Sequence, residues 1–205
     1  MTTIPNNHLT ERFDDALAYA SRIHRAQRRK GANIPYVSHL LGVAAIAIEN
    51  GATEDQAIAA LLHDAVEDQG GAERLGDIRN RFGEEVARIV DDCTDSDTHP
   101  KPPWRTRKEA YLASLSHKPG SSLEVSIADK THNAGAIVAD LHIHGEQVWT
   151  RFTGGKDGSL WYYRELSDVF AELVPGTASD RFARLVDEME LLAGRTSDNT
   201  RDLLE

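Results

Sequence analysis

Residues 61–70 read LLHDAVEDQG, and this stretch determines the prediction of both fold and site. Its two leucines indicate a buried helix face, yet four titratable side chains follow within two turns: His63, Asp64, Glu67 and Asp68. Such groups are seldom buried unless they are paired or bind a metal ion, and carboxylates near the C-terminal end of a helix oppose its dipole. A bound cation would offset both costs.

The spacing of these residues places them on neighbouring turns of one predicted helix. Side chains three and four residues apart share a helix face, so Glu67 lies near both His63 and Asp64. Helical side chains also lean toward the N-terminus, so Glu67 and Asp68 tilt back over the His-Asp pair. His63 and Asp64 can therefore meet one cation, while the two later carboxylates reach a water molecule beside it.

Two ligands do not complete a metal site, and two more candidates stand in otherwise apolar segments. His39 follows Tyr-Val-Ser at the start of an apolar predicted helix, and Asp129 interrupts the apolar run VSIADKTHNAGAIV. Asn133 lies one turn after Asp129 on the same face. With the His63-Asp64 pair, these ligands offer two imidazoles and two carboxylates, a mixture suited to Mn²⁺ or Fe and less to structural Zn²⁺. Each feature alone is more often structural, but their conjunction favours a metal site.

Composition and charge narrow the function classes. The chain of 205 residues has 40% hydrophobic content and one cysteine, Cys93, so no intrachain disulfide is expected. No apolar run approaches the roughly 18 residues of a membrane helix, and no signal or transit peptide is evident, so we expect a cytoplasmic protein without a membrane partner. The net charge of −10 disfavours nucleic acid as a partner. The basic segment HRAQRRK, residues 24–30, favours a small anion instead.

Helical periodicity dominates the chain, and no stretch shows useful strand alternation. We predict a single all-α domain over residues 1–205 with about eight helices or more. Thr10 and Thr53 are the predicted N-caps of the first and third helices. The predicted helices cover residues 10–30, 38–50, 53–69, 72–82, 84–93, 104–116, 123–141, 159–173 and 179–193, and residues 91–103 are predicted to form a loop.

Three segments resemble, in this order, the motifs of the HD-domain hydrolases of the RelA/SpoT homolog family, and within it the small alarmone hydrolases. They are HRAQRRKG with PYVSH, then LLHDAVED, then IADKTHN, and they spread over residues 24–133. Two positions depart from the usual pattern: Thr131 stands where leucine is usual, and Ser38 precedes His39 where asparagine is frequent. Neither departure removes a predicted ligand.

The resemblance implies an HD-domain helical bundle that removes the 3′-pyrophosphate of the nucleotide (p)ppGpp, giving GDP or GTP and pyrophosphate. It implies Mn²⁺ as the cofactor, although the ligand set also admits Fe, Zn²⁺ or another divalent ion. The metal ligands that it implies are His39, His63, Asp64 and Asp129. It further implies that the attacking water is oriented and deprotonated by Glu67 and Asp68, and that the nucleotide is bound by Arg29, Lys30 and Asn133. Because the sequence stops at Glu205, we expect a hydrolase without a synthetase domain.

Two alternatives stay open at this point. The nearer one is another HD-domain phosphohydrolase that acts on a deoxynucleotide, a nucleotide 2′-phosphate, a cyclic dinucleotide or (p)ppApp. The pair Glu67 and Asp68 and the basic segment favour the alarmone branch over it. The more distant one is a metal-binding regulator or antitoxin-like partner without turnover. The sequence is also compatible with a homo-oligomer.

Overall fold

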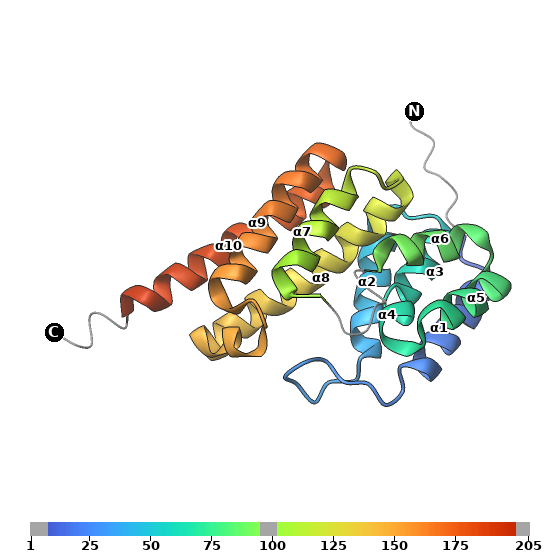
Figure 1. Ribbon diagram of the computed structural model, residues 1–205, viewed down its shortest axis with the longest axis horizontal. Helices are drawn as coiled ribbons and strands as arrows, with labels where there is room; N and C mark the ends of the chain where they lie inside the picture. The colour runs from blue at the N-terminus through green and yellow to red at the C-terminus, as the bar shows by residue number, and fades with distance from the viewer. Residues whose placement is uncertain (1–7, 95–101, 200–205) are drawn as a thin grey trace. The chain divides into compact units, whose positions relative to one another are not determined.

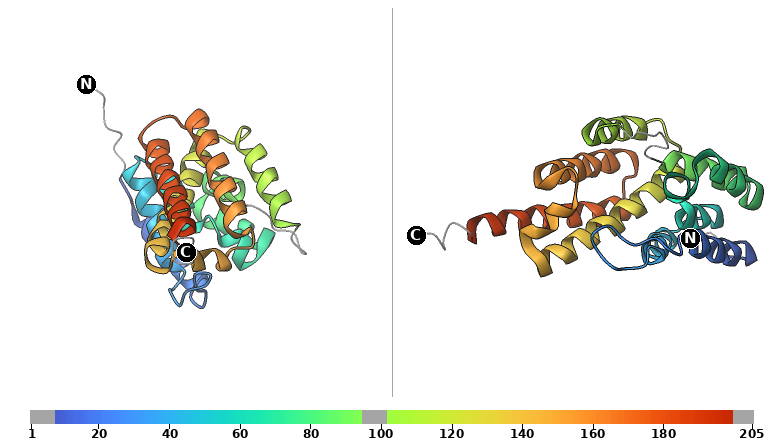
Figure 2. Two further views of the ribbon diagram at one scale, coloured as in Figure 1. Left: turned by 90° about the vertical axis from the view of Figure 1, so that its left-hand side faces the viewer. Right: turned by 60° about the horizontal axis from the view of Figure 1, so that its bottom comes forward.

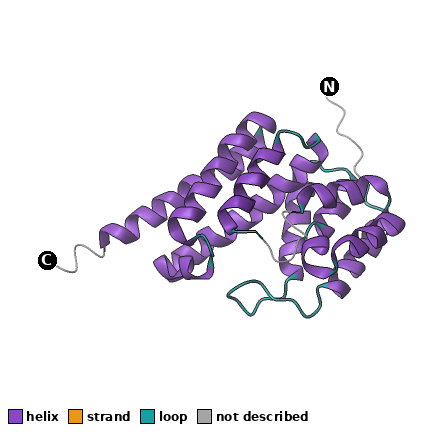
Figure 3. Cartoon of the chain, in the orientation of Figure 1, coloured by secondary structure: helices purple, strands orange, loops and turns teal. Residues whose placement is uncertain are grey.

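The structure is a computed structural model that describes residues 8–94 and 102–199. Every regular element in these ranges is a helix, apart from one isolated β-bridge between Arg28 and Pro35 (Figure 3). The all-α prediction is therefore confirmed. The elements are α1 (Glu11–Ile23), α2 (Val37–Glu49), α3 (Glu54–Leu62), α4 (Ala65–Gln69), α5 (Gly71–Phe82), α6 (Glu84–Cys93), α7 (Trp104–Leu115), α8 (Gly120–His144), the 3₁₀ helix η1 (Gly145–Arg151), α9 (Gly155–Leu173) and α10 (Thr177–Asn199).

The described chain divides into two compact units. The first comprises residues 8–94 and 117–129, and the second comprises residues 102–116 and 130–199. Helix α8 therefore contributes its N-terminal part, up to Asp129, to the first unit and the remainder to the second. The single-domain prediction concerns the whole chain and stays a prediction.

Helix α3 is the centre of the first unit. It packs against α1, α2 and α6 (Figure 1), and every residue from Gln56 to Leu62 is buried. Burial of one leucine side chain contributes about 1.5–3 kcal/mol, so the leucines of LLHDAVEDQG anchor this helix in the core. The surrounding core includes Ala16, Leu40, Ile78, Val86 and Ile89.

The predicted start of α3 is confirmed, but its predicted end at Gln69 is wrong. Thr53 and Gln56 form a capping box, in which each side chain accepts a hydrogen bond from the backbone N–H of the other. The helix ends at Leu62, because Asp64 adopts φ −95° and ψ 0°, and a new helix, α4, begins at Ala65. The Asp68 N–H then donates to the Asp64 carbonyl across 3.0 Å. The HD pair thus occupies a break between two helices.

The first helix is also shorter than predicted. Thr10 caps its start as expected, but α1 ends at Ile23 rather than at Lys30. Residues 27–36 instead form a hairpin loop, in which the Tyr36 N–H donates to the Gln27 carbonyl and the Arg29 N–H donates to the Ile34 carbonyl. Gly31, at φ 74°, supplies the left-handed turn at its tip. These backbone hydrogen bonds close the loop and take the place of bonds that a continued helix would make.

The second unit contains α7, α9, α10 and η1 with the C-terminal part of α8. Helix α9 packs along α10, side by side in both views of Figure 2, and α7 packs against α9. Helices α8 and α10 extend beyond their predicted ends, and residues 95–101 of the predicted loop lie outside the described residues. Among the helices that the structure describes, none is long and apolar enough to cross a membrane.

Candidate metal centre

Three buried side chains from three separate segments converge in the first unit. His39 comes from α2, His63 from the end of α3 and Asp129 from α8, with exposed fractions of 1%, 2% and 7%. Their ligand atoms all lie within 4.8 Å of one another, close enough to hold one metal ion. Residues far apart in the sequence are therefore brought together at one place in the first unit.

The distances within the cluster match those between ligands of a common ion. Two atoms that each lie about 2.1 Å from one ion are roughly 3–4.2 Å apart, depending on the angle between them. Asp129 Oδ1 lies 3.3 Å from His39 Nε2 and 3.5 Å from His63 Nε2. Asp64 Oδ2 lies 3.0 Å from His63 Nε2 and 3.5 Å from His39 Nε2. Asp64, half-buried at the break after α3, is thus placed as the fourth member.

The hydrogen bonding of His63 fits a metal ligand. Its Nδ1 lies 2.8 Å from the Ala60 carbonyl, which can only accept, so Nδ1 carries the proton. In the neutral ring Nε2 then presents its lone pair toward the cluster. This nitrogen is buried and faces the carboxylate oxygens of Asp64 and Asp129. A buried lone pair beside carboxylate oxygens is what a divalent cation requires, and the backbone contact fixes the ring as in known metal sites.

The electrostatics of the His-Asp pair are consistent with this arrangement. Burial by itself lowers the pKa of His63, but the carboxylates of Asp64 and Asp129 outweigh burial and hold it well above its usual value. Burial likewise raises the pKa of Asp64, but the charge of His63 and the hydrogen bond from His39 bring it well below its usual value. A proton on His63 therefore offsets part of the negative charge of the two carboxylates, and a metal ion would replace that proton on binding.

Tyr36 supports the cluster, a role that the sequence did not reveal. Its hydroxyl donates to Asp64 Oδ2 across 2.6 Å, and its ring packs edge-on against His39. Burial and the nearby Asp64 carboxylate raise the pKa of Tyr36, so the hydroxyl keeps its proton and remains a donor. No spacing rule connects Tyr36 with Asp64, because the two residues come from different elements.

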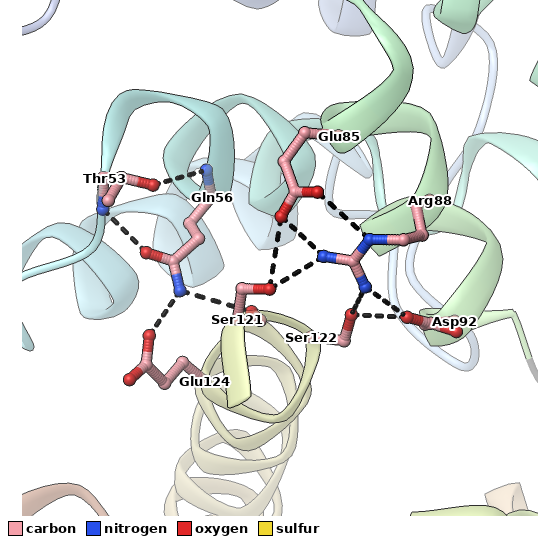
Figure 4. Close-up of polar contacts among 8 residues, drawn as sticks. All are labelled: Thr53, Gln56, Glu85, Arg88, Asp92, Ser121, Ser122 and Glu124. Carbon is pink, nitrogen blue, oxygen red and sulfur yellow. Dashed lines mark hydrogen bonds and ion pairs between the residues drawn. The ribbon is translucent and has the colours of Figure 1, made fainter. Parts of the chain in front are cut away.

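A polar network fixes the start of α8, two turns before Asp129. Figure 4 shows Arg88 of α6 donating to Ser121 and Ser122 of α8 and to the carboxylates of Glu85 and Asp92. From the other side, the Gln56 amide of the α3 capping box donates to the Ser121 carbonyl and to Glu124 (Figure 4). These bonds join α3 and α6 to α8 within the first unit. They hold in register the helix that delivers Asp129.

The predicted catalytic carboxylates lie on the short helix α4. Glu67 is half-buried, and Asp68 is exposed and accepts a hydrogen bond from Gln27 Nε2 across 2.8 Å. The predicted catalytic roles of both stay predictions. What the structure adds is the partner of Asp68, which comes from the hairpin loop.

The predicted nucleotide-binding residues lie in two places. Arg29 and Lys30 belong to the hairpin loop, where the Arg29 guanidinium carbon lies 5.9 Å from the centre of the Tyr36 ring and Lys30 is exposed. Asn133 is half-buried on α8, four residues after Asp129, in the second unit. Their binding roles also stay predictions.

Comparison with known proteins supports the resemblance. The human guanosine-3′,5′-bis(diphosphate) 3′-pyrophosphohydrolase MESH1 is 39% identical over 123 residues, which cover 58% of this chain and 65% of that protein. The chain thus matches just under two thirds of that relative's length. The MESH1 protein of Drosophila melanogaster is 30% identical over 74% of this chain and 79% of its own length. A solved structure described as a metazoan ortholog of SpoT that hydrolyses ppGpp aligns with a TM-score of 0.69 and 26% identity, covering 92% of this chain and 97% of that one.

A family model describes the same region. The model of the HD domain matches residues 16–160, a range that contains every ligand of the candidate metal centre. Together with the His-Asp pair at the break after α3, this match confirms the resemblance inferred from the motifs. The chain therefore belongs to the HD domain family.

Proposed function

We propose that the protein hydrolyses the 3′-pyrophosphate of (p)ppGpp with Mn²⁺ as its cofactor, releasing pyrophosphate and GDP or GTP. The observation that carries the proposal is the buried cluster of His39, His63 and Asp129, with Asp64 beside it. It occurs in a chain whose relatives are named guanosine-3′,5′-bis(diphosphate) 3′-pyrophosphohydrolases. A cytoplasmic location and the possibility of self-association stay predictions from the sequence.

The ligand set suits this chemistry. Two imidazoles and two carboxylates match the preferences of Mn²⁺ and leave room for water and substrate oxygens. A divalent cation held there supplies positive charge to the phosphate oxygens and lowers the pKa of a nearby water molecule. Phosphoryl transfer depends mainly on such charge neutralisation and on positioning. A nucleophilic side chain is not needed for this chemistry, and burial raises the pKa of the Cys93 thiol, which disfavours its reactive thiolate form.

The carboxylates of Glu67 and Asp68 supply the general base for the attack of water. The water oxygen forms a bond to the phosphorus attached to the ribose 3′-oxygen, and the bond between that phosphorus and the 3′-oxygen breaks. Glu67 and Asp68 orient the water, one of the two carboxylates accepts the proton that it loses, and that proton is then passed to the 3′-oxygen, which becomes a hydroxyl. General base catalysis of this kind typically contributes about 10²–10⁴-fold.

The nucleoside is assigned to Arg29 and Lys30 of the hairpin loop, and a binding role of Asn133 stays a prediction from the sequence. The planar guanidinium of Arg29 can stack on a base, and the Lys30 ammonium can contact ribose or phosphate oxygens. These contacts would fix the nucleoside so that only its 3′ substituent reaches the cluster. The basic segment is the local exception in a chain with a net charge of −10, which supports an anionic ligand at this point.

The test is the identity of the first product. With Mn²⁺ and ppGpp we expect intact pyrophosphate and GDP, little reaction with GTP or dGTP, and loss of turnover with EDTA. The matched control is Asp129→Asn, which keeps the shape of the side chain but removes its charge. Orthophosphate as the first product, or faster turnover of a plain 5′-nucleotide, would favour another HD-domain phosphohydrolase. The absence of turnover with any nucleotide of the panel, including ppApp, would favour the non-catalytic alternative.

A further inference from the structure

Gln27 lies at the centre of a small group of polar side chains beside Asp68. Its Nε2 donates to Asp68 Oδ2 across 2.8 Å. Its Oε1 lies 2.7 Å from His24 Nδ1 and 2.6 Å from Gln69 Nε2. His24 is 2% exposed, so one side of this group is buried and the other reaches the exposed carboxylate.

The ionised carboxylate of Asp68 determines which atom donates and which accepts in each of these hydrogen bonds. An ionised aspartate only accepts, so the Gln27 group facing it must be the NH₂. Gln27 Oε1 then faces His24 and Gln69, so His24 donates from a protonated Nδ1 and Gln69 donates from its amino group. Burial lowers the pKa of His24 and so favours the neutral ring. The single ring proton of neutral His24 is then on Nδ1. All three side chains therefore have one compatible orientation.

The same loop also holds the other aspartate of the motif. The His24 ring stacks on Tyr36, with the ring centres 5.4 Å apart, and Tyr36 donates to Asp64. The Tyr36 N–H donates to the Gln27 carbonyl across 3.0 Å, so the two donor residues are joined by their backbones. One closed loop thus fixes the side chains of both Asp64 and Asp68.

We propose that Gln27 is a positioning residue, which fixes the carboxylate of Asp68 in one orientation for the activation of water. The inference rests on the proposed function for the role of Asp68. The loop itself is closed by backbone hydrogen bonds, so the Gln27 side chain is not required to close it. Its contribution is instead a direct hydrogen bond to the Asp68 carboxylate, which favours one orientation of that side chain.

The first experiment tests the contact without reference to turnover. In ¹⁵N-labelled protein, the side-chain amide signal of Gln27 is identified by its loss in Gln27→Leu. We expect that signal to move, and its hydrogen exchange to accelerate, in Asp68→Ala, a change at an exposed position that leaves the core intact. The side-chain signal of Gln147, which is exposed in η1, should not change. An unaltered Gln27 signal in Asp68→Ala would overturn the inference.

The second experiment is a double-mutant cycle on the hydrolysis of ppGpp. Misplacement of a catalytic group by about 1 Å can cost roughly 100-fold, so Gln27→Leu should lower kcat by about 10–100-fold while the KM and the bound Mn²⁺ stay near the wild-type values. In the Asp68→Asn background the same change should have no further effect, because Gln27 acts through Asp68. Gln147→Leu is the control and should match the wild type.

The outcomes distinguish the positioning role of Gln27 from the proposed hydrolysis of (p)ppGpp. Losses that multiply in the double variant, or an unchanged kcat in Gln27→Leu, would overturn the positioning role while pyrophosphate release by the wild type still supports the proposed function. If the wild type released no pyrophosphate, the proposed function would fail and so would any role of Gln27 in that reaction. The amide signal would then still decide whether Gln27 fixes Asp68.

Discussion

The hydroxyl of Tyr36 donates to Asp64 Oδ2, the same oxygen that lies 3.0 Å from His63 Nε2. A carboxylate oxygen has two lone pairs, so it can accept from Tyr36 and still face the metal cluster. We expect Tyr36→Phe to keep the fold but to weaken Mn²⁺ binding or turnover by about 10–100-fold, the usual effect of losing a residue that orients a ligand. Calorimetric titration with Mn²⁺ and the initial rate with ppGpp measure the two effects.

The chain offers a matched control for this change. Tyr19 donates to Asp77 over the same distance, 2.6 Å, in the first unit. Tyr19→Phe removes a hydrogen bond of the same type from a place that is not assigned to the site. It should alter stability but neither Mn²⁺ affinity nor kcat. Equal losses of Mn²⁺ affinity in both variants would show that the effect of Tyr36 is merely one of general stability.

Metal binding should stabilise the folded protein measurably. Mn²⁺ at 100 times its Kd contributes about 2.7 kcal/mol, which for a chain of this size corresponds to a rise in Tm of roughly 5–10 °C. Asp129→Asn should abolish this rise and the bound metal, whereas Cys93→Ser should change neither. Thermal melts with and without Mn²⁺, together with elemental analysis, provide the measurement. Stoichiometric metal in Asp129→Asn would remove this residue from the ligand set.

Ligation and catalysis should be separable at Glu67 and Asp68. Glu67→Gln and Asp68→Asn keep the size of the side chains and should retain Mn²⁺. If the two acids accept the proton of the attacking water, kcat should fall by about 10²–10⁴-fold. The measurement is the steady-state rate with ppGpp at saturating Mn²⁺. Losses below about tenfold in both variants would exclude the two residues from general base catalysis.

The hairpin loop should act on substrate affinity. In the variant carrying both Arg29→Ala and Lys30→Ala, KM should rise more than kcat falls, because these residues are assigned to binding that persists from ground state to transition state. Arg25→Ala removes one exposed positive charge from the neighbouring basic segment and serves as the control, with a smaller change in KM expected. A pure kcat defect would instead assign Arg29 and Lys30 to the transition state.

The capping box of α3 should be worth a measurable free energy of unfolding. Thr53→Ala removes the hydroxyl that accepts from the Gln56 N–H, and the loss of such a cap costs about 0.5–2 kcal/mol. Urea unfolding measures this quantity. Thr106→Ala, at an exposed position inside α7, lacks a capping role and should change stability by less than about 0.5 kcal/mol.

The sequence predicted some of these features because they depend on local spacing. The capping box at Thr53, the helical periods and the apolar surroundings of His39 and Asp129 are all properties of short segments. The spacing does not predict the break at Asp64, because LLHDAVEDQG is compatible with one continuous helix and the contact of Asp64 with Tyr36 comes from tertiary structure. The hairpin loop was missed for a similar reason. Its basic residues have good helix propensity, while its stability comes from backbone pairing between Gln27 and Tyr36.

The origin of the ligands in three separate segments of the chain has a consequence for chain entropy. The three ligands His39, His63 and Asp129 are distant along the chain, so bringing them together closes long loops and lowers the chain entropy. Packing of the core around α3 compensates for this loss of entropy when the protein folds. The cation and the substrate then meet groups that need no further ordering. A synthetic peptide containing LLHDAVEDQG alone carries two of the ligands without that prior ordering. It should therefore bind Mn²⁺ far more weakly than the intact protein does.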